Sequence, residues 1–153
     1  MKHLTIVIPE GENNVSSITG TYEIFCKANA FQKQQGNREL FTIQLAGISK
    51  KVDYNEGLFT VKPPRNISTI TKPDLIIIPS LNHNYHTSLK SNKELTEWIA
   101  IQYKAGAEVA SICTGAFLLA ASGLLDGKAC STHWSVTDNF RSMFPKVNLQ
   151  TDK

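Results

Sequence analysis

The stretch of sequence that decides the fold is SICTGAFLLAASGLLDGKACSTHW, residues 111–134. It places Cys113 between a short apolar strand and a helix of small residues, and His133 follows twenty positions later, at the end of the next predicted strand. The amides and the dipole at the start of a helix stabilise a thiolate. A cysteine at such a turn has the geometry of a nucleophile elbow, so the use made of Cys113 decides what the chain does.

The composition is that of an ordinary globular domain. The chain has 153 residues, of which 41% are hydrophobic and 19% charged. That length is enough for one domain with its own core, and we expect a single domain over residues 1–153. The net charge of +3 comes from scattered lysines and arginines. Such a weak charge gives no basis for nucleic-acid binding by this chain alone.

The cysteines and the N-terminus indicate the compartment. No apolar run approaches the roughly 20 residues that span a bilayer. The start, MKHLTIVIPEG, lacks the long apolar stretch and cleavage site of a signal peptide. Cys26, Cys113 and Cys130 are odd in number and widely spaced, which favours free thiols in a reducing environment. We expect a cytoplasmic protein that makes no use of a membrane.

Strand and helix patterns alternate along the chain. The predicted strands are residues 3–8, 40–48, 74–79, 107–112, 129–132 and 147–150, with a hairpin over 50–62. The predicted helices are residues 16–34, 91–104, 115–122 and 134–143, the second opened by a capping box of Ser91 and Glu94. This alternation predicts an α/β domain with a doubly wound, mostly parallel sheet flanked by helices. The last strand has no helix to cover it, so we expect a domain truncated at its C-terminus.

Cys113 and His133 are the first candidates for chemistry. Cys113 is either a thiolate nucleophile or redox-sensing thiol, with the amides of Thr114 and Gly115 facing an oxyanion, or a small buried residue at a tight turn. His133 falls at the carboxyl end of the next strand along the chain, and sites of open α/β sheets cluster at such ends. It forms a Cys–His pair or merely bonds a loop, and Trp134 beside it lines a pocket or packs.

The remaining candidates are weaker. Acids that would support a Cys–His pair are Glu10, Glu12 and Glu23, and none is compelling from the sequence. His83 and His86 have a spacing that suits a metal, but a polar loop explains them better, and we expect no metal. The segment PEGENN after the first strand matches neither phosphate-binding nor dinucleotide-binding patterns, so we expect no cofactor.

These motifs resemble the PfpI-like branch of the class I glutamine amidotransferase-like superfamily, and more closely the N-terminal domain of AraC-type transcriptional regulators. The segment CTGAFLLAASGLLDGKACSTHW carries most of the resemblance, supported by residues 20–29, 72–79 and 140–147. The resemblance implies a flavodoxin-like fold and a homodimer. In such regulators a helix-turn-helix region follows this domain and binds DNA, and no such region is present in this sequence.

The resemblance also implies roles for particular residues. Enzymes of the superfamily carry the nucleophile where Cys113 stands and often a histidine where His133 stands. They carry an acid at the position of Ser17 and a glycine pair, whose amides help to build the oxyanion hole, at Ser80 and Leu81. Serine supplies no negative charge, and leucine is a poor choice where backbone must approach a substrate.

The favoured function is therefore a ligand-sensing or dimerisation domain without catalytic activity. An unidentified small molecule would bind at an elbow pocket of Ser17, Ser80, Leu81, Cys113, Thr114, Gly115, His133 and Trp134. The alternative is a cysteine-dependent hydrolase or hydratase, such as an amidase or isonitrile hydratase, in which Glu23 or a water held by Ser17 replaces the missing acid. A third possibility is a vestigial site in a domain that only dimerises.

Overall fold

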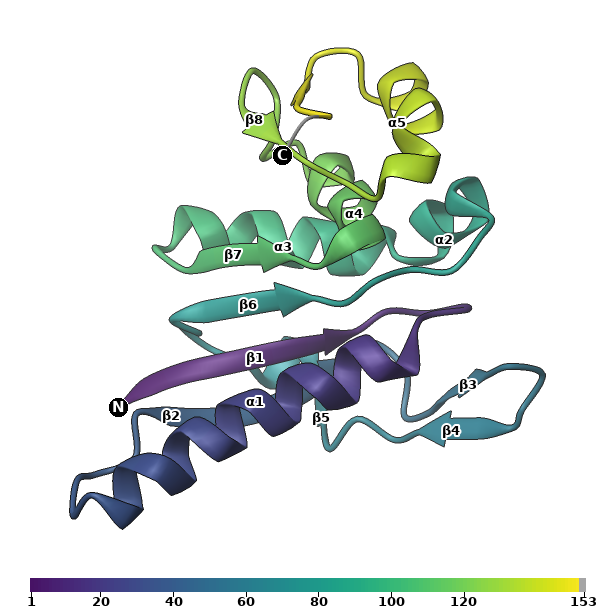
Figure 1. Ribbon diagram of the computed structural model, residues 1–153. Helices are drawn as coiled ribbons and strands as arrows, with labels where there is room; N and C mark the ends of the chain where they lie inside the picture. The colour runs from purple at the N-terminus through teal and green to yellow at the C-terminus, as the bar shows by residue number, and fades with distance from the viewer. Residues whose placement is uncertain (152–153) are drawn as a thin grey trace.

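The centre of the molecule is a five-stranded sheet in which every pair of neighbouring strands is parallel (Figure 1). The structure, a computed structural model, describes residues 1–151. The strands, in their order across the sheet, are β5 (Arg65–Asn66), β2 (Phe41–Gly47), β1 (Lys2–Ile8), β6 (Leu75–Ile78) and β7 (Glu108–Ser111). The predicted α/β class and parallel sheet are confirmed.

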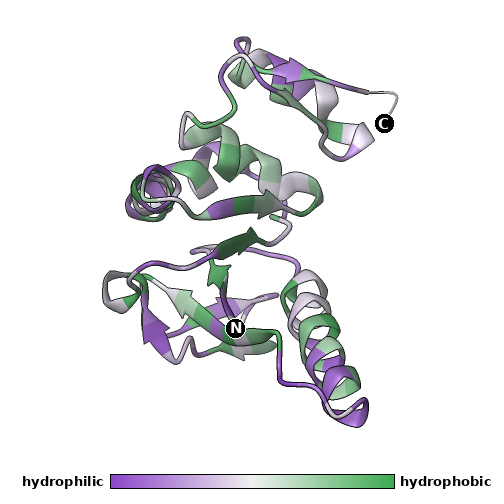
Figure 2. Cartoon of the chain, turned by 90° about the vertical axis from the view of Figure 1, so that its left-hand side faces the viewer, coloured by the Kyte–Doolittle hydropathy of each residue, from purple (hydrophilic) through white to green (hydrophobic). Residues whose placement is uncertain are grey.

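Helices cover the two faces of this sheet and create two cores. The helix α1 (Val15–Gln34) lies on one face, over the fully buried Leu4 and Ile6 of β1 (Figure 1). The helices α2 (Tyr85–Ser91), α3 (Lys93–Lys104) and α4 (Ala116–Ala121) lie on the other face. Since successive strand residues point to opposite faces, strands buried on both sides are apolar throughout. Figure 2 shows hydrophobic residues gathered on these central strands.

The predicted capping box at Ser91 is wrong. Ser91 is the last residue of the short helix α2, and α3 begins two residues later at Lys93. The residue between them, Asn92, is fully buried, and its side-chain amide accepts from the Glu10 amide at 2.7 Å and donates to the Glu10 carbonyl at 3.0 Å. A side-chain amide both donates and accepts, so it satisfies a buried backbone segment that a serine hydroxyl at the helix start would not reach.

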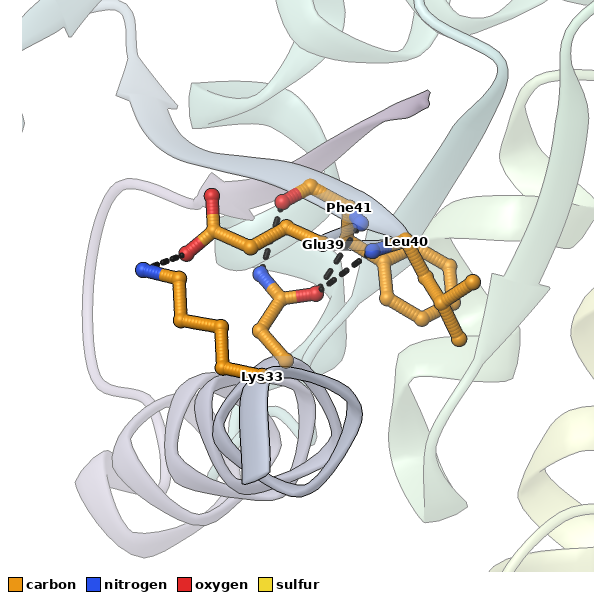
Figure 3. Close-up of polar contacts among 5 residues, drawn as sticks. Lys33, Glu39, Leu40 and Phe41 are labelled. Atoms are coloured by element: carbon orange, nitrogen blue, oxygen red, sulfur yellow. Dashed lines mark hydrogen bonds and ion pairs between the residues drawn. The ribbon is translucent and has the colours of Figure 1, made fainter. Parts of the chain in front are cut away.

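The second strand is joined to the C-terminal half of α1 by one buried side chain. Asn29, on α1, donates to the Phe41 carbonyl at 2.7 Å and accepts the amides of Leu40 and Phe41, each at 3.0 Å (Figure 3). The ion pair of Lys33 with Glu39, at 2.6 Å, lies beside it (Figure 3). These bonds fix where the chain leaves the helix and enters β2.

The predicted hairpin is present, with β3 (Val52–Tyr54) antiparallel to β4 (Phe59–Val61). The Tyr54 side chain is fully buried, and burial raises its pKa to about 12. Its hydroxyl donates to the Pro9 carbonyl and accepts from the Asn13 side chain, both at 3.4 Å. The hairpin is thereby anchored to the loop that follows β1.

The C-terminal strands do not extend the central sheet. A two-stranded parallel sheet of β8 (Ala129–Cys130) and β9 (Asn148–Leu149) lies beyond the β7 edge, with α5 (Thr137–Met143) beside it (Figure 1). Cys113 and His133 thus follow consecutive strands of the chain, as the sequence predicts, but these strands belong to different sheets. The turn through Gly123 to Gly127 carries the chain away from β7 before β8 begins. Within residues 1–151, no helix is long and apolar enough to cross a membrane.

Candidate functional site

Cys113 lies at the strand-to-helix turn that the sequence predicts. It directly follows the β7 strand and Ile112, and it starts the short 3-10 helix η2 (Cys113–Gly115). Its backbone φ is +52°, a left-handed conformation, and the residue is exposed. For a residue with a side chain this conformation costs about 1–2 kcal/mol. The turn is therefore strained, and it presents the thiol at the carboxyl end of the sheet.

The turn depends on close packing at Gly115. A Cβ atom at this position would lie 2.6 Å from the Pro79 carbonyl oxygen and 2.8 Å from that of Ile78. Neither contact is tolerable, so only glycine lets η2 pack directly against the end of β6. Gly115 is buried, and its role in the structure is to allow this close approach between η2 and β6.

Hydrogen bonds join the same turn to the loop after β6. The Thr114 hydroxyl donates to the Leu81 carbonyl at 2.6 Å and lies 2.8 Å from the Ser80 hydroxyl. Since Thr114 has a single hydroxyl proton, it accepts from Ser80 while it donates to Leu81. All three residues are buried, so these bonds stabilise the turn at Cys113 from inside the protein.

Ser17 meets Ser80 at the position where the resembled enzymes carry an acid and a glycine pair. The Ser80 amide donates to the Ser17 hydroxyl oxygen at 3.0 Å, and that hydroxyl donates to the Asn14 carbonyl at 2.7 Å. The Ser80 carbonyl in turn accepts from the Asn14 amide at 3.0 Å. The backbone of Ser80 is thus bonded on both sides to the start of α1, and its amide is not free to face an oxyanion.

Two of the three candidate acids are bonded elsewhere, and the third is exposed. The Glu10 carboxylate accepts the Ser49 amide at 3.1 Å, and the Glu12 carboxylate accepts the Asn55 amide at 3.0 Å. Both therefore bond segments on the hairpin side of the molecule. Glu23 is exposed on α1. In residues 1–151, neither hydrogen bonds nor ion pairs link a carboxylate to Cys113 or His133.

One pocket, of about 350 Å³, brings Cys113, His133 and Trp134 together. Its other lining residues are Ser111, Ser131, Thr132, Thr137 and Thr151. The Thr132 hydroxyl donates to the Cys113 carbonyl at 3.2 Å, which ties the segment after β8 to the elbow. The pocket is within the size range of small-molecule sites, and its walls are rich in hydroxyl groups and carry no carboxylate. Ser17, Ser80, Leu81, Thr114 and Gly115 are not among its lining residues.

His133 has a defined role in its own loop. Its Nδ1 accepts the Ser135 amide at 3.3 Å and lies 2.7 Å from the Ser135 hydroxyl, which caps the short 3-10 helix η3 (Trp134–Val136). A backbone amide only donates, so Nδ1 carries no proton in the neutral ring and Nε2 carries it. Neutral His133 therefore presents a donor at Nε2 and has no free nitrogen to take a proton from a thiol. Trp134 next to it is 78% exposed at the pocket rim.

Tyr85 is a residue of this region that the sequence pattern does not single out. Its ring stacks on Phe117 with centroids 3.9 Å apart and an angle of 9°. Burial raises the pKa of Tyr85, and the charge of a Cys113 thiolate raises it further, so the phenol stays protonated near the elbow. In the sequence, Tyr85 is marked only by its place in the loop LNHNYH, where the two histidines are the more obvious candidates. His83 and His86 are exposed, and residues 1–151 hold no group of three or more metal-ligating His, Cys, Asp or Glu side chains.

A doubly wound parallel sheet with a cysteine at a strained strand-to-helix turn defines an α/β domain of the nucleophile-elbow class. The profile of the DJ-1/PfpI family matches residues 15–148. The chain belongs to the DJ-1/PfpI family.

Similar proteins include both regulators and an enzyme. The HTH-type transcriptional regulator GbdR of Pseudomonas aeruginosa is 36% identical over 121 residues, which are 77% of this chain and 31% of GbdR. The chain thus spans about a third of that relative. Isonitrile hydratase of Pseudomonas putida is 38% identical over 50 residues, 33% of this chain and 22% of the hydratase. An AraC family transcriptional regulator of Pseudomonas putida has the same fold, with a TM-score of 0.76, 15% identity, and coverage of 98% of this chain and 76% of the other.

Proposed function

We propose that residues 1–153 form a ligand-sensing or dimerisation domain of an AraC-type transcriptional regulator, without catalytic activity. The observation that carries this proposal is the bond from the Ser80 amide to the Ser17 hydroxyl. The Ser80 amide corresponds to a backbone donor that faces the substrate in the resembled enzymes. Here that amide is bonded to Ser17, the residue at the position of their acid. The similarity to GbdR supports the regulatory part of the proposal.

The catalytic machinery is incomplete in three respects. Ser17 provides no charge, and neutral His133 offers no acceptor to the thiol because Nδ1 is already bonded. The Ser80 amide is already bonded as well, and loss of one oxyanion donor alone slows acyl-transfer enzymes by about 100- to 1,000-fold. The chain thus keeps the strand-to-helix turn with its thiol but lacks free groups that would activate the thiol and stabilise an oxyanion.

The pocket at Cys113 suits a small polar molecule. Its hydroxyl groups offer donors and acceptors, the Nε2 proton of His133 offers a donor, and the exposed Trp134 ring offers an apolar face at the rim. Such a mixture of groups fixes the orientation of a bound ligand. Because the pocket lies between the elbow and the segment after β8, a ligand that contacts both would favour one arrangement of these two parts.

The regulator would act as a homodimer in the cytoplasm. An arrangement favoured by the effector would alter the packing of the dimer and so the position of a separate helix-turn-helix region, which would make the contacts with DNA. The weak net charge of +3 agrees with a domain that does not itself hold DNA.

Two observations favour the alternative, a cysteine-dependent hydrolase or hydratase. Cys113 keeps the left-handed, exposed conformation of a nucleophile, and a 50-residue segment resembles isonitrile hydratase. The Cys113 sulfur would bond to the substrate carbon while the thiol proton passes to the substrate, and a water would then displace the sulfur and restore the thiol. Since Glu23 is exposed on α1, a water held by Ser17 would replace the missing acid.

A thermal-shift screen of the purified chain against a panel of small polar metabolites tests the sensing proposal. We expect at least one metabolite to raise the melting temperature, and we expect Trp134→Ala to remove the shift. Leu58→Ala is the matched control, since Leu58 is 73% exposed on the distant hairpin turn. A panel without any stabilising member would favour the vestigial, purely dimerising domain.

A further inference from the structure

A second polar site lies on the face of the sheet opposite α1. Successive residues of β1 and β2 on this face pair as His3 with Thr42 and Thr5 with Gln44. Parallel sheets are normally apolar on both faces, because helices cover both. The next pair on the same face, Val7 with Ala46, is apolar and belongs to the core under α2, α3 and α4. Along β1 and β2 this face therefore changes from apolar to polar, and the polar part lies outside the hydrophobic core.

This surface is a groove of about 550 Å³. It is lined by His3, Thr42, Gln44, Arg65, Thr69, Ile70, Thr71 and Lys72. The floor is fixed, since Thr5 is fully buried and its hydroxyl accepts from the Gln44 side chain at 2.9 Å. The volume is that of a site for a molecule larger than a single ion.

The charges of the groove are all of one sign. Arg65 and Lys72 line it, His3 adds a titratable ring, and no carboxylate is among the lining residues. Among residues 1–151, neither Arg65 nor Lys72 takes part in an ion pair. The neighbouring acid, Asp74, accepts the His3 backbone amide at 2.6 Å. Two cations are thus left without an internal counter-charge around a hydroxyl-bearing floor.

We propose that this groove binds a small molecule that carries a phosphate group. The Arg65 guanidinium presents a planar fork of donors that matches two phosphate oxygens, and Lys72 supplies a second positive charge. The hydroxyls of Thr42 and Thr71 complete the set of donors, while Thr69 is already bonded to the Asn66 carbonyl. The site lies towards the amino ends of β1 and β2, away from the Cys113 pocket, and it does not rest on the proposed sensing function.

Titration calorimetry of the full chain at constant ionic strength tests the site with inorganic phosphate and with glycerol 3-phosphate as probes. We expect saturable binding of both, weakened by about tenfold or more in Arg65→Gln, because charge-assisted hydrogen bonds are lost. Lys72→Asn should weaken binding as well, and it is a safe change because asparagine tolerates the φ of +52° at this position.

Lys27→Gln is the matched control, since it removes one charge from an exposed position of α1 on the other side of the sheet. It should leave both affinities unchanged, and so should Cys113→Ala. The proposal is overturned if neither probe binds, if only inorganic phosphate binds, or if Lys27→Gln weakens binding as much as Arg65→Gln does.

Discussion

The amide of Ser80 donates a hydrogen bond of 3.0 Å to the hydroxyl of Ser17, across 63 positions of sequence. This bond joins the loop after β6 to the first turn of α1. In the enzymes that the chain resembles, the same two places hold an acid and a free backbone donor. In this chain the Ser80 amide and the Ser17 hydroxyl bond each other, so the contact at these two places is a structural one.

Removal of that contact should lower stability. In Ser17→Ala the Ser80 amide loses its acceptor in a partly buried place, and we expect the free energy of unfolding to fall by about 1–2 kcal/mol. Urea denaturation measures the change. Ser16→Ala is the control, since Ser16 is exposed and the hydrogen bonds found for it within residues 1–151 use its backbone and not its hydroxyl. Equal midpoints for the two variants would show that the contact contributes nothing.

The close packing at Gly115 predicts opposite effects of one substitution at two glycines. Gly115→Ala forces a methyl group against the Pro79 and Ile78 carbonyls and should destabilise by about 1–3 kcal/mol. Gly20→Ala, in the middle of α1 with open space around it, should stabilise by about 0.5–1 kcal/mol. Denaturation of both variants checks the pair. Changes of the same sign would contradict the packing seen at the elbow.

The left-handed backbone of Cys113 predicts that strain is released when its side chain is removed. Cys113→Gly should be about 1 kcal/mol more stable than Cys113→Ala, because only glycine adopts a φ of +52° without penalty. Both variants lack the thiol, so the comparison isolates the backbone. A Cys113→Ala protein as stable as Cys113→Gly would mean that the turn is not strained.

The buried phenol of Tyr54 predicts a loss of stability at high pH. Burial raises the pKa of Tyr54 from 10.0 to about 12. The folded state therefore holds this proton more tightly than the unfolded chain does. The contribution is complete below pH 10 and is lost as the pH rises towards 12, with a magnitude of about 2–3 kcal/mol.

Tyrosinate absorbance and denaturation across that range measure this effect. Tyr54→Phe should lack the ionisation step near pH 12 and lose less stability between pH 10 and pH 12 than the wild-type chain. Tyr103→Phe, on the exposed side of α3, is the matched control. The account fails if Tyr54→Phe and the wild-type chain lose stability equally over this range.

The sequence predicts the architecture well because the architecture rests on local patterns. Aliphatic runs such as residues 74–79 and small-residue helices such as residues 115–122 specify buried elements without knowledge of their partners. The position of Cys113 follows from the same patterns. Its left-handed backbone does not, and neither does the approach of Gly115 to the carbonyl of Pro79, because that approach joins segments far apart in the sequence.

Long-range contacts escape such local patterns. Ser91 and Glu94 matched a local cap, but the buried side chain of Asn92 bonds Glu10 across 82 positions and sets the helix boundary instead. Consecutive strands predict a Cys113–His133 pair, whereas within residues 1–151 β8 pairs with β9 in a sheet of its own. The pocket still forms, because the Thr132 hydroxyl bonds the Cys113 carbonyl.

The measurement that tests the central claim most directly is turnover by the purified chain and its Cys113→Ala variant. The substrates are amides, isonitriles and glyoxals, which cover the reactions open to a cysteine elbow of this class. A sensing domain predicts no turnover above the rate without protein for either chain. Turnover by the wild-type chain that disappears in Cys113→Ala would contradict the account and establish the domain as an enzyme.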